Sequence, residues 1–168
     1  MINEKIQDAF NEQLNAELYS SYLYLSMAAY FQSVNLEGLA SWMRCQAQEE
    51  ILHAMKFYNF INERAGRVLL AAIEGPPIKW ESPLAAFEDA YRHEEKVTGL
   101  INNLVDLAIQ EKDHAANAFL QWFVNEQVEE ESSVDAVVHQ LKLAGDQGSG
   151  LFMIDRELAT RVFVLPPA

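Results

Sequence analysis

The sequence predicts an all-α fold: an antiparallel four-helix bundle with one long crossover between the second and third helices, and a short fifth C-terminal helix. Three observations indicate this fold. Apolar residues recur at helical spacing nearly throughout, no alternating strand pattern is present, and only one connection exceeds a few residues. We expect a single domain spanning residues 1–168, because a chain of 168 residues is large enough for one full core.

The long helices are expected at about residues 3–31, 36–65, 83–110 and 114–144, and a short amphipathic helix at about 149–162. Gly66 is expected to end the second helix as a left-handed C-cap residue. Ser82 and Pro83 supply an N-cap and a first-turn proline for the third helix, and Asp113 can cap the fourth. Gly145 ends that fourth helix.

The connection lengths predict the topology. The first two helices and the last two long helices are joined by two short turns, so each pair forms an antiparallel hairpin. The remaining link has about 15 residues and can reach ~50 Å, whereas a helix of ~29 residues is ~43 Å long. The link can therefore return along the whole bundle, which leaves the second and third helices parallel. Four side chains then arrive at one level, namely Glu17, Glu50, Glu94 and Gln127.

Composition excludes several classes of protein. A net charge of -13 argues against a nucleic-acid partner, because phosphate backbones require clusters of Lys and Arg. The single cysteine, Cys45, excludes an intramolecular disulfide framework and a four-cysteine metal site. No apolar run is long enough for a membrane span, and the N-terminus has no apolar signal core. We expect a cytoplasmic protein with no nucleic-acid or membrane partner.

Acidic and amide side chains interrupt the apolar stripes of all four long helices. Burying a lone carboxylate costs several kcal/mol, so such groups are neutralised, paired or bound to a cation. Lys and Arg total only 12, and none lies on these stripes. The pattern predicts a metal site built from the following side chains, with His53 beside them: Glu17, Glu50, Glu94, Gln127 and Glu130.

Glu50 and His53 form an E-x-x-H pair on one face of the second helix. Carboxylates with one imidazole suit iron or manganese better than they suit zinc, which is typically held in a tetrahedral site with thiolate ligands. Two adjacent ions would share Glu50 as a bridge, with Glu17 and His53 on the first ion. Glu94 and Glu130 would hold the second.

Three segments, residues 15–25, 48–54 and 119–131, resemble prokaryotic non-haem ferritins, which belong to the ferritin-like family of di-iron carboxylate proteins. The likeness covers essentially the whole chain, including the crossover and the fifth helix. It implies a cage of 24 identical subunits that oxidises Fe(II) with O2 or H2O2. The ferric product would be stored as an oxyhydroxide mineral inside the cage.

The resemblance also implies roles for individual residues. The expected ferroxidase ligands are Glu17, Glu50, His53, Glu94 and Glu130, with Gln127 next to them. Tyr24 and Trp122 match the aromatic residues that lie beside the centre in this family. A third iron site is expected at the positions of Glu49, Glu126, Glu129 and Glu130.

Two positions depart from related families. Ile51 stands where haem-binding bacterioferritins have a methionine, so no haem is expected. Those proteins also carry a second E-x-x-H motif, whereas here the corresponding positions hold Gln127 and Glu130. We therefore expect a second iron position with fewer strong donors than the first.

Other interpretations remain open from the sequence. A di-iron oxidase or oxygenase would retain its two irons and transform an organic substrate, but such sites usually carry two E-x-x-H motifs. In a non-catalytic bundle, the acids would instead form structural ion pairs. A solvated helix face is the alternative explanation for the acidic run from Glu126 to Glu131, and ordinary core packing is the alternative for Tyr24 and Trp122.

Overall fold

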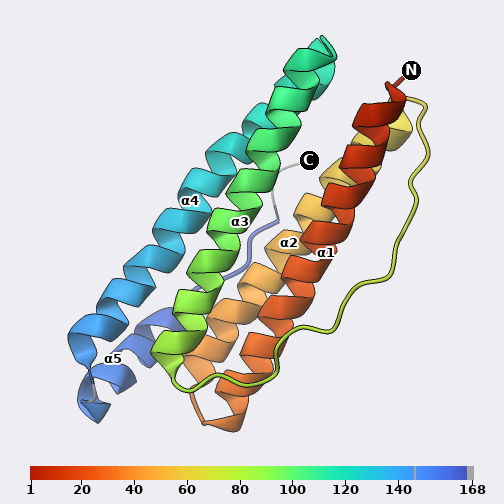
Figure 1. Ribbon diagram of the computed structural model, residues 1–168. Coiled ribbons are helices and arrows are strands. Elements are labelled where there is room, and N and C mark those ends of the chain that lie inside the picture. The colour runs from red at the N-terminus through yellow and green to blue at the C-terminus, as the bar shows by residue number, and fades with distance from the viewer. Residues whose placement is uncertain (146, 166–168) are drawn as a thin grey trace.

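The computed structural model describes residues 1–145 and 147–165, which form a four-helix bundle with a fifth helix across one end (Figure 1). α1 packs against α2 and α3 against α4, each pair joined by a short turn, so the predicted all-α bundle is confirmed. The helices are α1 (Glu4–Ser33), α2 (Glu37–Glu63), α3 (Pro83–Gln110), α4 (His114–Ala144) and α5 (Gly148–Leu158).

The connection between α2 and α3 runs along the outside of α1 for the length of the bundle (Figure 1). Asn11 holds one end of it, because its Oδ1 accepts a hydrogen bond from the backbone N–H of Leu69 at 2.8 Å. Near the other end, Ser26 Oγ donates to the carbonyl oxygen of Pro77 at 2.5 Å. α2 and α3 are therefore parallel, as the connection lengths predicted.

The predicted caps of α3 and α4 are confirmed. Ser82 Oγ accepts from the backbone N–H of Ala85 at 3.1 Å, and Pro83 is the first residue of α3. Asp113 Oδ1 accepts from the N–H of Ala116 at 3.0 Å. Each cap satisfies an amide that has no partner within its helix, which fixes where these helices begin.

The predicted left-handed conformation at Gly66 is wrong, because Ala65 adopts it instead, with φ 56°. The amides of Ala65 and Gly66 donate to the carbonyls of Asn62 at 3.0 Å and Ile61 at 2.9 Å, which is the Schellman pattern with Ala65 at C′. Gly66 has a different role. A Cβ at this position would lie 2.7 Å from Ile2 Cγ2, so the glycine permits the close approach of the N-terminal residues.

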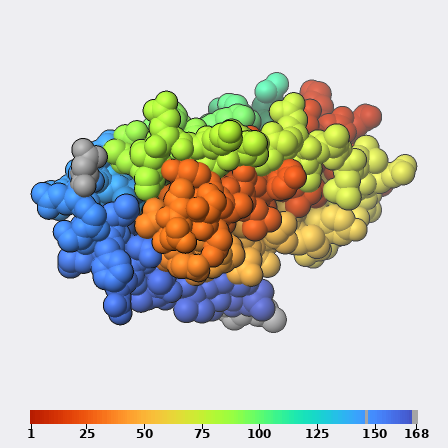
Figure 2. All heavy atoms as spheres, turned by 90° about the horizontal axis from the view of Figure 1, so that it is seen from below, coloured from red at the N-terminus to blue at the C-terminus, as the bar shows by residue number. Residues whose placement is uncertain are grey.

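The predicted end of the fifth helix at about residue 162 is also wrong, since α5 ends at Leu158. Leu158 is the last residue of α5 that is buried in the core, and Val162 is exposed. Residues 159–165 turn back and lie beside α2 (Figure 2). Their position is fixed by contacts that the helical pattern of the sequence does not contain, including one between Cys45 Sγ and the carbonyl oxygen of Arg161 at 3.6 Å.

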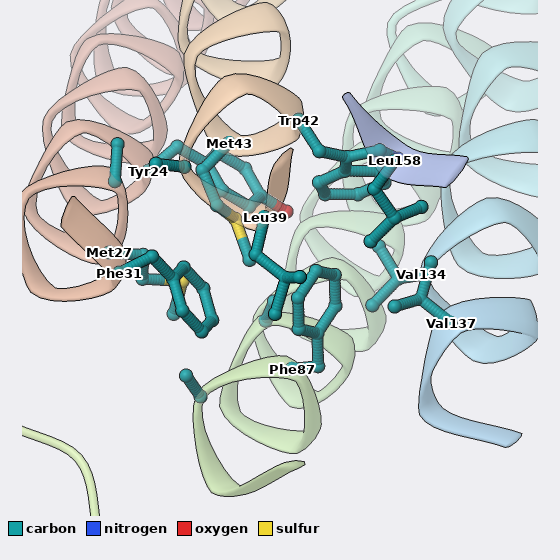
Figure 3. Close-up of a cluster of buried hydrophobic side chains, with 14 of the residues drawn as sticks. Tyr24, Met27, Phe31, Leu39, Trp42, Met43, Phe87, Val134, Val137 and Leu158 are labelled. Carbon is teal, nitrogen blue, oxygen red and sulfur yellow. The ribbon is translucent and has the colours of Figure 1, made fainter. Parts of the chain in front are cut away.

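Buried apolar side chains form two separate clusters, one in each half of the bundle. The first includes Tyr24, Phe31, Trp42, Phe87 and Val134, with Leu158 of α5 next to Trp42 (Figure 3). The second is rich in phenylalanine and occupies the half that contains the start of α1. No helix in the described parts of the chain is long and apolar enough to cross a membrane.

Candidate metal centre

A layer of buried polar side chains lies between the two hydrophobic clusters. Each long helix contributes to it at mid-length, as the topology predicted. Every one of the six predicted central residues is 5% exposed or less: Glu17 on α1, Glu50 and His53 on α2, Glu94 on α3, and Gln127 and Glu130 on α4.

Glu17, Glu50 and His53 form one compact donor group, in which one atom from each lies within 4.8 Å of the others. His53 Nδ1 is 3.3 Å from Glu50 Oε2 and 4.0 Å from Glu17 Oε2. Gln13 Nε2 donates to Glu17 Oε1 at 2.8 Å. Glu17 Oε2 is buried and has no hydrogen-bond partner among the described residues, which leaves a free carboxylate oxygen aimed at the group.

Glu94 is held by neutral donors on two sides. The Tyr24 hydroxyl donates to Glu94 Oε1, and Gln127 Nε2 donates to Glu94 Oε2 at 3.2 Å. Gln127 Nε2 also lies 3.2 Å from Thr98 Oγ1. These contacts orient the Glu94 carboxyl group without neutralising it.

Glu130 connects the central layer to a second donor group. Gln46 Nε2 donates to Glu130 Oε2 at 2.6 Å. One atom each from His53, Glu126 and Glu130 lies within 4.8 Å of the others. His53 Nε2 is 3.8 Å from Glu126 Oε1, so the imidazole stands between the two donor groups and faces one with each nitrogen.

Burial strongly disfavours ionisation of this layer. It raises the pKa of Glu17 to about 8, and the neighbouring Glu50 adds to the effect. The pKa of Glu94 likewise rises to about 8 through burial and Glu130, and that of Glu50 to about 7 through burial. Burial opposes the charged form of His53, but the carboxylates around it, Glu50 foremost, raise its pKa well above the usual value.

The interpretation that these acids form structural ion pairs is not supported. Within residues 1–145 and 147–165, no Lys or Arg forms an ion pair with Glu17, Glu50 or Glu94. In the described part of the chain, His53 is the one basic group paired with them, and it is shared among several carboxylates. A group of carboxylates with a free buried oxygen and one imidazole fits a hard or intermediate divalent cation such as iron or manganese.

The residues predicted for the third metal position line a cavity of about 350 Å³ beside the centre. Its acidic lining is Glu49, Glu126, Glu129 and Glu130. One cation also lines it, because Arg161 Nη2 forms an ion pair with Glu49 Oε2 at 2.6 Å. Burial raises the pKa of Glu49 although Arg161 acts in the opposite direction.

The two predicted aromatic residues take different positions. Tyr24 is fully buried and touches Glu94 through its hydroxyl. Trp122 is 37% exposed and packs edge-on against His53, with ring centroids 5.3 Å apart. Lys56 Nζ lies 4.0 Å from the centre of the Trp122 ring. Tyr24 therefore contacts Glu94 of the polar layer, and Trp122 contacts His53 of the donor groups.

Sequence reasoning missed three polar residues of the site. Gln13 and Gln46 precede Glu17 and Glu50 by four residues, so their helical spacing alone places them on the buried faces. That signal was available. Arg161 carried no such signal, since it lies 112 residues from Glu49 in the chain and beyond the end of α5.

The chain matches the ferritin-like domain family over residues 7–144. It is 45% identical over 161 residues to a bacterial non-heme ferritin of Bacteroides fragilis, a match that covers 96% of this chain and all of that protein. It is 40% identical over 163 residues to a bacterial non-heme ferritin of Staphylococcus saprophyticus, covering 97% and 98% of the two chains.

Solved structures give the same result. The chain is similar to an open-pore ferritin from the hyperthermophilic archaeon Archaeoglobus fulgidus, with 54% identity and a TM-score of 0.96 over 96% of this chain and all of that one. A closed form of the Archaeoglobus fulgidus ferritin, engineered by site-directed mutagenesis, gives a TM-score of 0.97 with 54% identity, over 98% and 100% of the two chains.

Proposed function

Because this chain belongs to the ferritin-like domain family, we propose that it is an iron-storage protein with ferroxidase activity. Fe(II) is its substrate, and ferric oxyhydroxide is the stored product. The observation that carries this function is the buried carboxylate layer. There, Glu17 Oε2 has no hydrogen-bond partner among the described residues, and one oxygen each of Glu17 and Glu50 lies within 4.8 Å of a His53 nitrogen.

The first iron position is assigned to Glu17, Glu50 and His53, which already form a compact donor group. Glu50 would be shared with the second position, where Glu94 and Glu130 supply the oxygens. Gln127 supports this position from outside by donating to Glu94. An amide in place of another anionic ligand leaves the second ion more weakly held and more open to an oxidant.

The chemistry follows from the ligand type. Hard carboxylate oxygens stabilise Fe(III) relative to Fe(II), which favours loss of an electron from each ion. Two Fe(II) ions together supply two electrons, and one O2 with two protons becomes H2O2. If H2O2 is the oxidant, the same two electrons and two protons yield two water molecules. The ferric ions then leave the centre and hydrolyse.

Proton release accompanies entry of the substrate. With pKa values of about 8, Glu17 and Glu94 carry protons near neutral pH when no cation is present. An entering Fe(II) ion replaces those protons, because metal ligands bind as the deprotonated groups. The layer is thus neutral enough to remain buried without iron and becomes anionic when iron arrives.

We assign a third iron position to Glu49, Glu126, Glu129 and Glu130, which line the adjacent cavity. We further propose a cytoplasmic homo-oligomer of 24 subunits in which the mineral is enclosed. The near-complete overlap with ferritin structures supports a multi-subunit cage of this kind.

Aerobic addition of excess Fe(II), followed by size separation and iron counting, tests this function. Iron far above three atoms per chain that elutes with a particle of several hundred kilodaltons is the expected result. Retention of two irons per chain without further accumulation would instead indicate a di-iron enzyme with an organic substrate. Absence of bound iron would return the carboxylates to a structural role.

A further inference from the structure

The segment after α5 brings a positive charge to the edge of the acidic cavity. Residues 159–165 run beside α2 (Figure 2). The Arg161 guanidinium lies over the Trp42 ring at 4.4 Å, and its Nη2 reaches Glu49 Oε2. Arg161 Nη1 is buried and has no hydrogen-bond partner among the described residues, so only part of the guanidinium is satisfied.

The cavity itself carries an excess of negative charge. Four carboxylates line it against this single cation, and its remaining polar lining is Ser132 and Ser133. Glu126 and Glu129 are also neighbours on one helix face, where like charges repel. Arg161 therefore offsets a repulsion that a metal ion in the same cavity would offset more strongly.

We propose that Arg161 is a tethered counter-cation of the third metal position, which an incoming ion must displace. This inference rests on the proposed function, because it assigns Arg161 a role at a site of that function. The ion pair between Arg161 Nη2 and Glu49 Oε2 already offsets the charge of Glu49, so a metal ion at this carboxylate competes with the guanidinium. In addition, the charge of Arg161 repels a divalent cation held by Glu126, Glu129 or Glu130.

The contacts that hold Arg161 are few enough to be exchanged. It lies beyond Leu158, the last buried residue of α5, on a segment whose Val162 and Val164 are exposed. An ion pair, one cation–π contact, the contact from Cys45 and a backbone hydrogen bond from its N–H to the carbonyl oxygen of Leu158 at 3.3 Å hold it. Displacement by a metal ion thus requires local release of a short segment and leaves the bundle intact.

The consequence is an order of filling. The Glu17 and Glu50 group has no Lys or Arg ion pair within the described residues, so iron binds there without displacing a charged side chain. The third position opens only when Fe(II) is abundant enough to compete with Arg161. The C-terminal segment would then report, by its release, that this position is filled.

Equilibrium dialysis of the assembled protein against graded anaerobic Fe(II) tests the proposal by counting bound iron per chain. Arg161→Ala is the test variant. Arg156→Ala is its control. Arg156 lies on α5 against Phe152 and does not line the cavity, so this substitution removes the same charge at a different place. In Arg161→Ala we expect the third position to fill at about tenfold lower free Fe(II), because the half-buried ion pair that competes with the metal ion is gone.

The outcomes separate this inference from the proposed function. A third isotherm that is equal in the wild type, Arg161→Ala and Arg156→Ala overturns the role of Arg161, as does the absence of a third ion in Arg161→Ala. If the wild type does not bind the first two ions, the proposed metal centre itself is refuted. Arg161→Gln, which keeps a long side chain over Trp42, guards against a purely structural effect and is expected to behave like the alanine variant.

Hydrogen exchange along the segment gives an independent measurement. If Arg161 is displaced, amide protection in residues 159–165 falls as the third ion binds and not as the first two bind. A structural tether would keep the same protection at every Fe(II) concentration. The readout depends on neither oxidation nor mineral formation.

Discussion

The Asp155 side chain of α5 accepts a hydrogen bond from the backbone N–H of Gly38, in the first turn of α2, at 2.8 Å. The same Oδ1 accepts from the N–H of Leu39 at 3.0 Å. Leu36, the N-cap residue of α2, provides no side-chain cap. α2 is therefore capped by a carboxylate from the far end of the chain, which couples the start of the helix that carries Glu50 and His53 to the docking of α5.

Asp155→Ala should lower the free energy of unfolding by about 1 kcal/mol, the usual effect of losing an N-cap. Gly38→Ala should cost more, since its Cβ would lie 1.6 Å from the carbonyl oxygen of Asp155 and would force α5 away. Chemical denaturation, with hydrogen exchange in α5, measures both. Gly99→Ala is the matched control. It lies exposed on α3 with no atom within 4 Å of its Cβ, and should stabilise by about 0.5–1 kcal/mol.

His53→Ala removes the one imidazole of the centre and should slow initial Fe(II) oxidation by about a hundredfold or more, since even residues that only orient metal ligands are worth 10–100-fold. Glu17→Ala should act similarly. Stopped-flow absorbance measures the rate, and size-exclusion chromatography checks that the oligomer remains intact. His139→Ala, an exposed histidine on α4, should oxidise iron at the wild-type rate. Unchanged rates in both centre variants would refute the assignment of these ligands.

Stability of the metal-free protein should fall as pH rises from about 4.5 to about 8. In that range the unfolded chain has lost protons that Glu17, Glu50 and Glu94 still hold when folded. The folded state thus binds more protons than the unfolded chain. For each extra proton, the free energy of unfolding falls by about 1.4 kcal/mol for every unit by which the pH rises. The raised pKa of His53 acts with the same sign. Denaturant titrations with a chelator present measure the slope.

Glu17→Gln should flatten this dependence, because a neutral amide replaces a carboxyl group whose pKa is raised to about 8. It should also stabilise the metal-free protein at pH 8 while weakening iron binding. Glu63→Gln, at the exposed end of α2, provides the control substitution. Equal slopes for the wild type and Glu17→Gln would contradict the protonated state assigned to the layer.

Tyr24→Phe should reduce the oxidation rate by about tenfold, the effect expected when a carboxylate loses a good hydrogen bond. Its hydroxyl donates to Glu94, and the substitution leaves that oxygen less well oriented. Tyr30→Phe is a suitable control, since Tyr30 packs against Phe31 and Trp80 away from the donor groups. A Tyr24→Phe rate equal to that of the control would show that Tyr24 serves packing alone.

Local signals in the sequence predicted the helices that carry explicit start and stop residues. α3 and α4 begin where Ser82 and Asp113 were predicted to cap them, and Gly145 ends α4. α5 was predicted too long because its amphipathic pattern continues past the point at which core contacts end, at Leu158. At Gly66, its place after the helical pattern predicted a C-cap role, whereas in the structure the glycine leaves room for the close approach of the Ile2 side chain.

In the site, too, local helical spacing was predictable and contacts between distant segments were not. Helix lengths and the long crossover were enough to predict that Glu17, Glu50 and Glu94 would lie at one level, because helical rise depends only on residue number. Gln13 and Gln46 could have been found from their spacing to these acids. Arg161 could not, since its position depends on how the segment after α5 packs against Cys45 and Trp42.

The division of the core into two apolar clusters on either side of a polar layer separates two tasks along the length of each helix. The apolar clusters at the two ends hold the four long helices in register, while the middle layer can contain buried charged and polar groups. Substitutions confined to the polar layer can therefore alter which metal ion binds, or how fast it reacts, while the packing of the four helices is kept. A scaffold divided in this way is well suited to acquiring new metal chemistry, because the residues that set reactivity are not the residues that stabilise the fold.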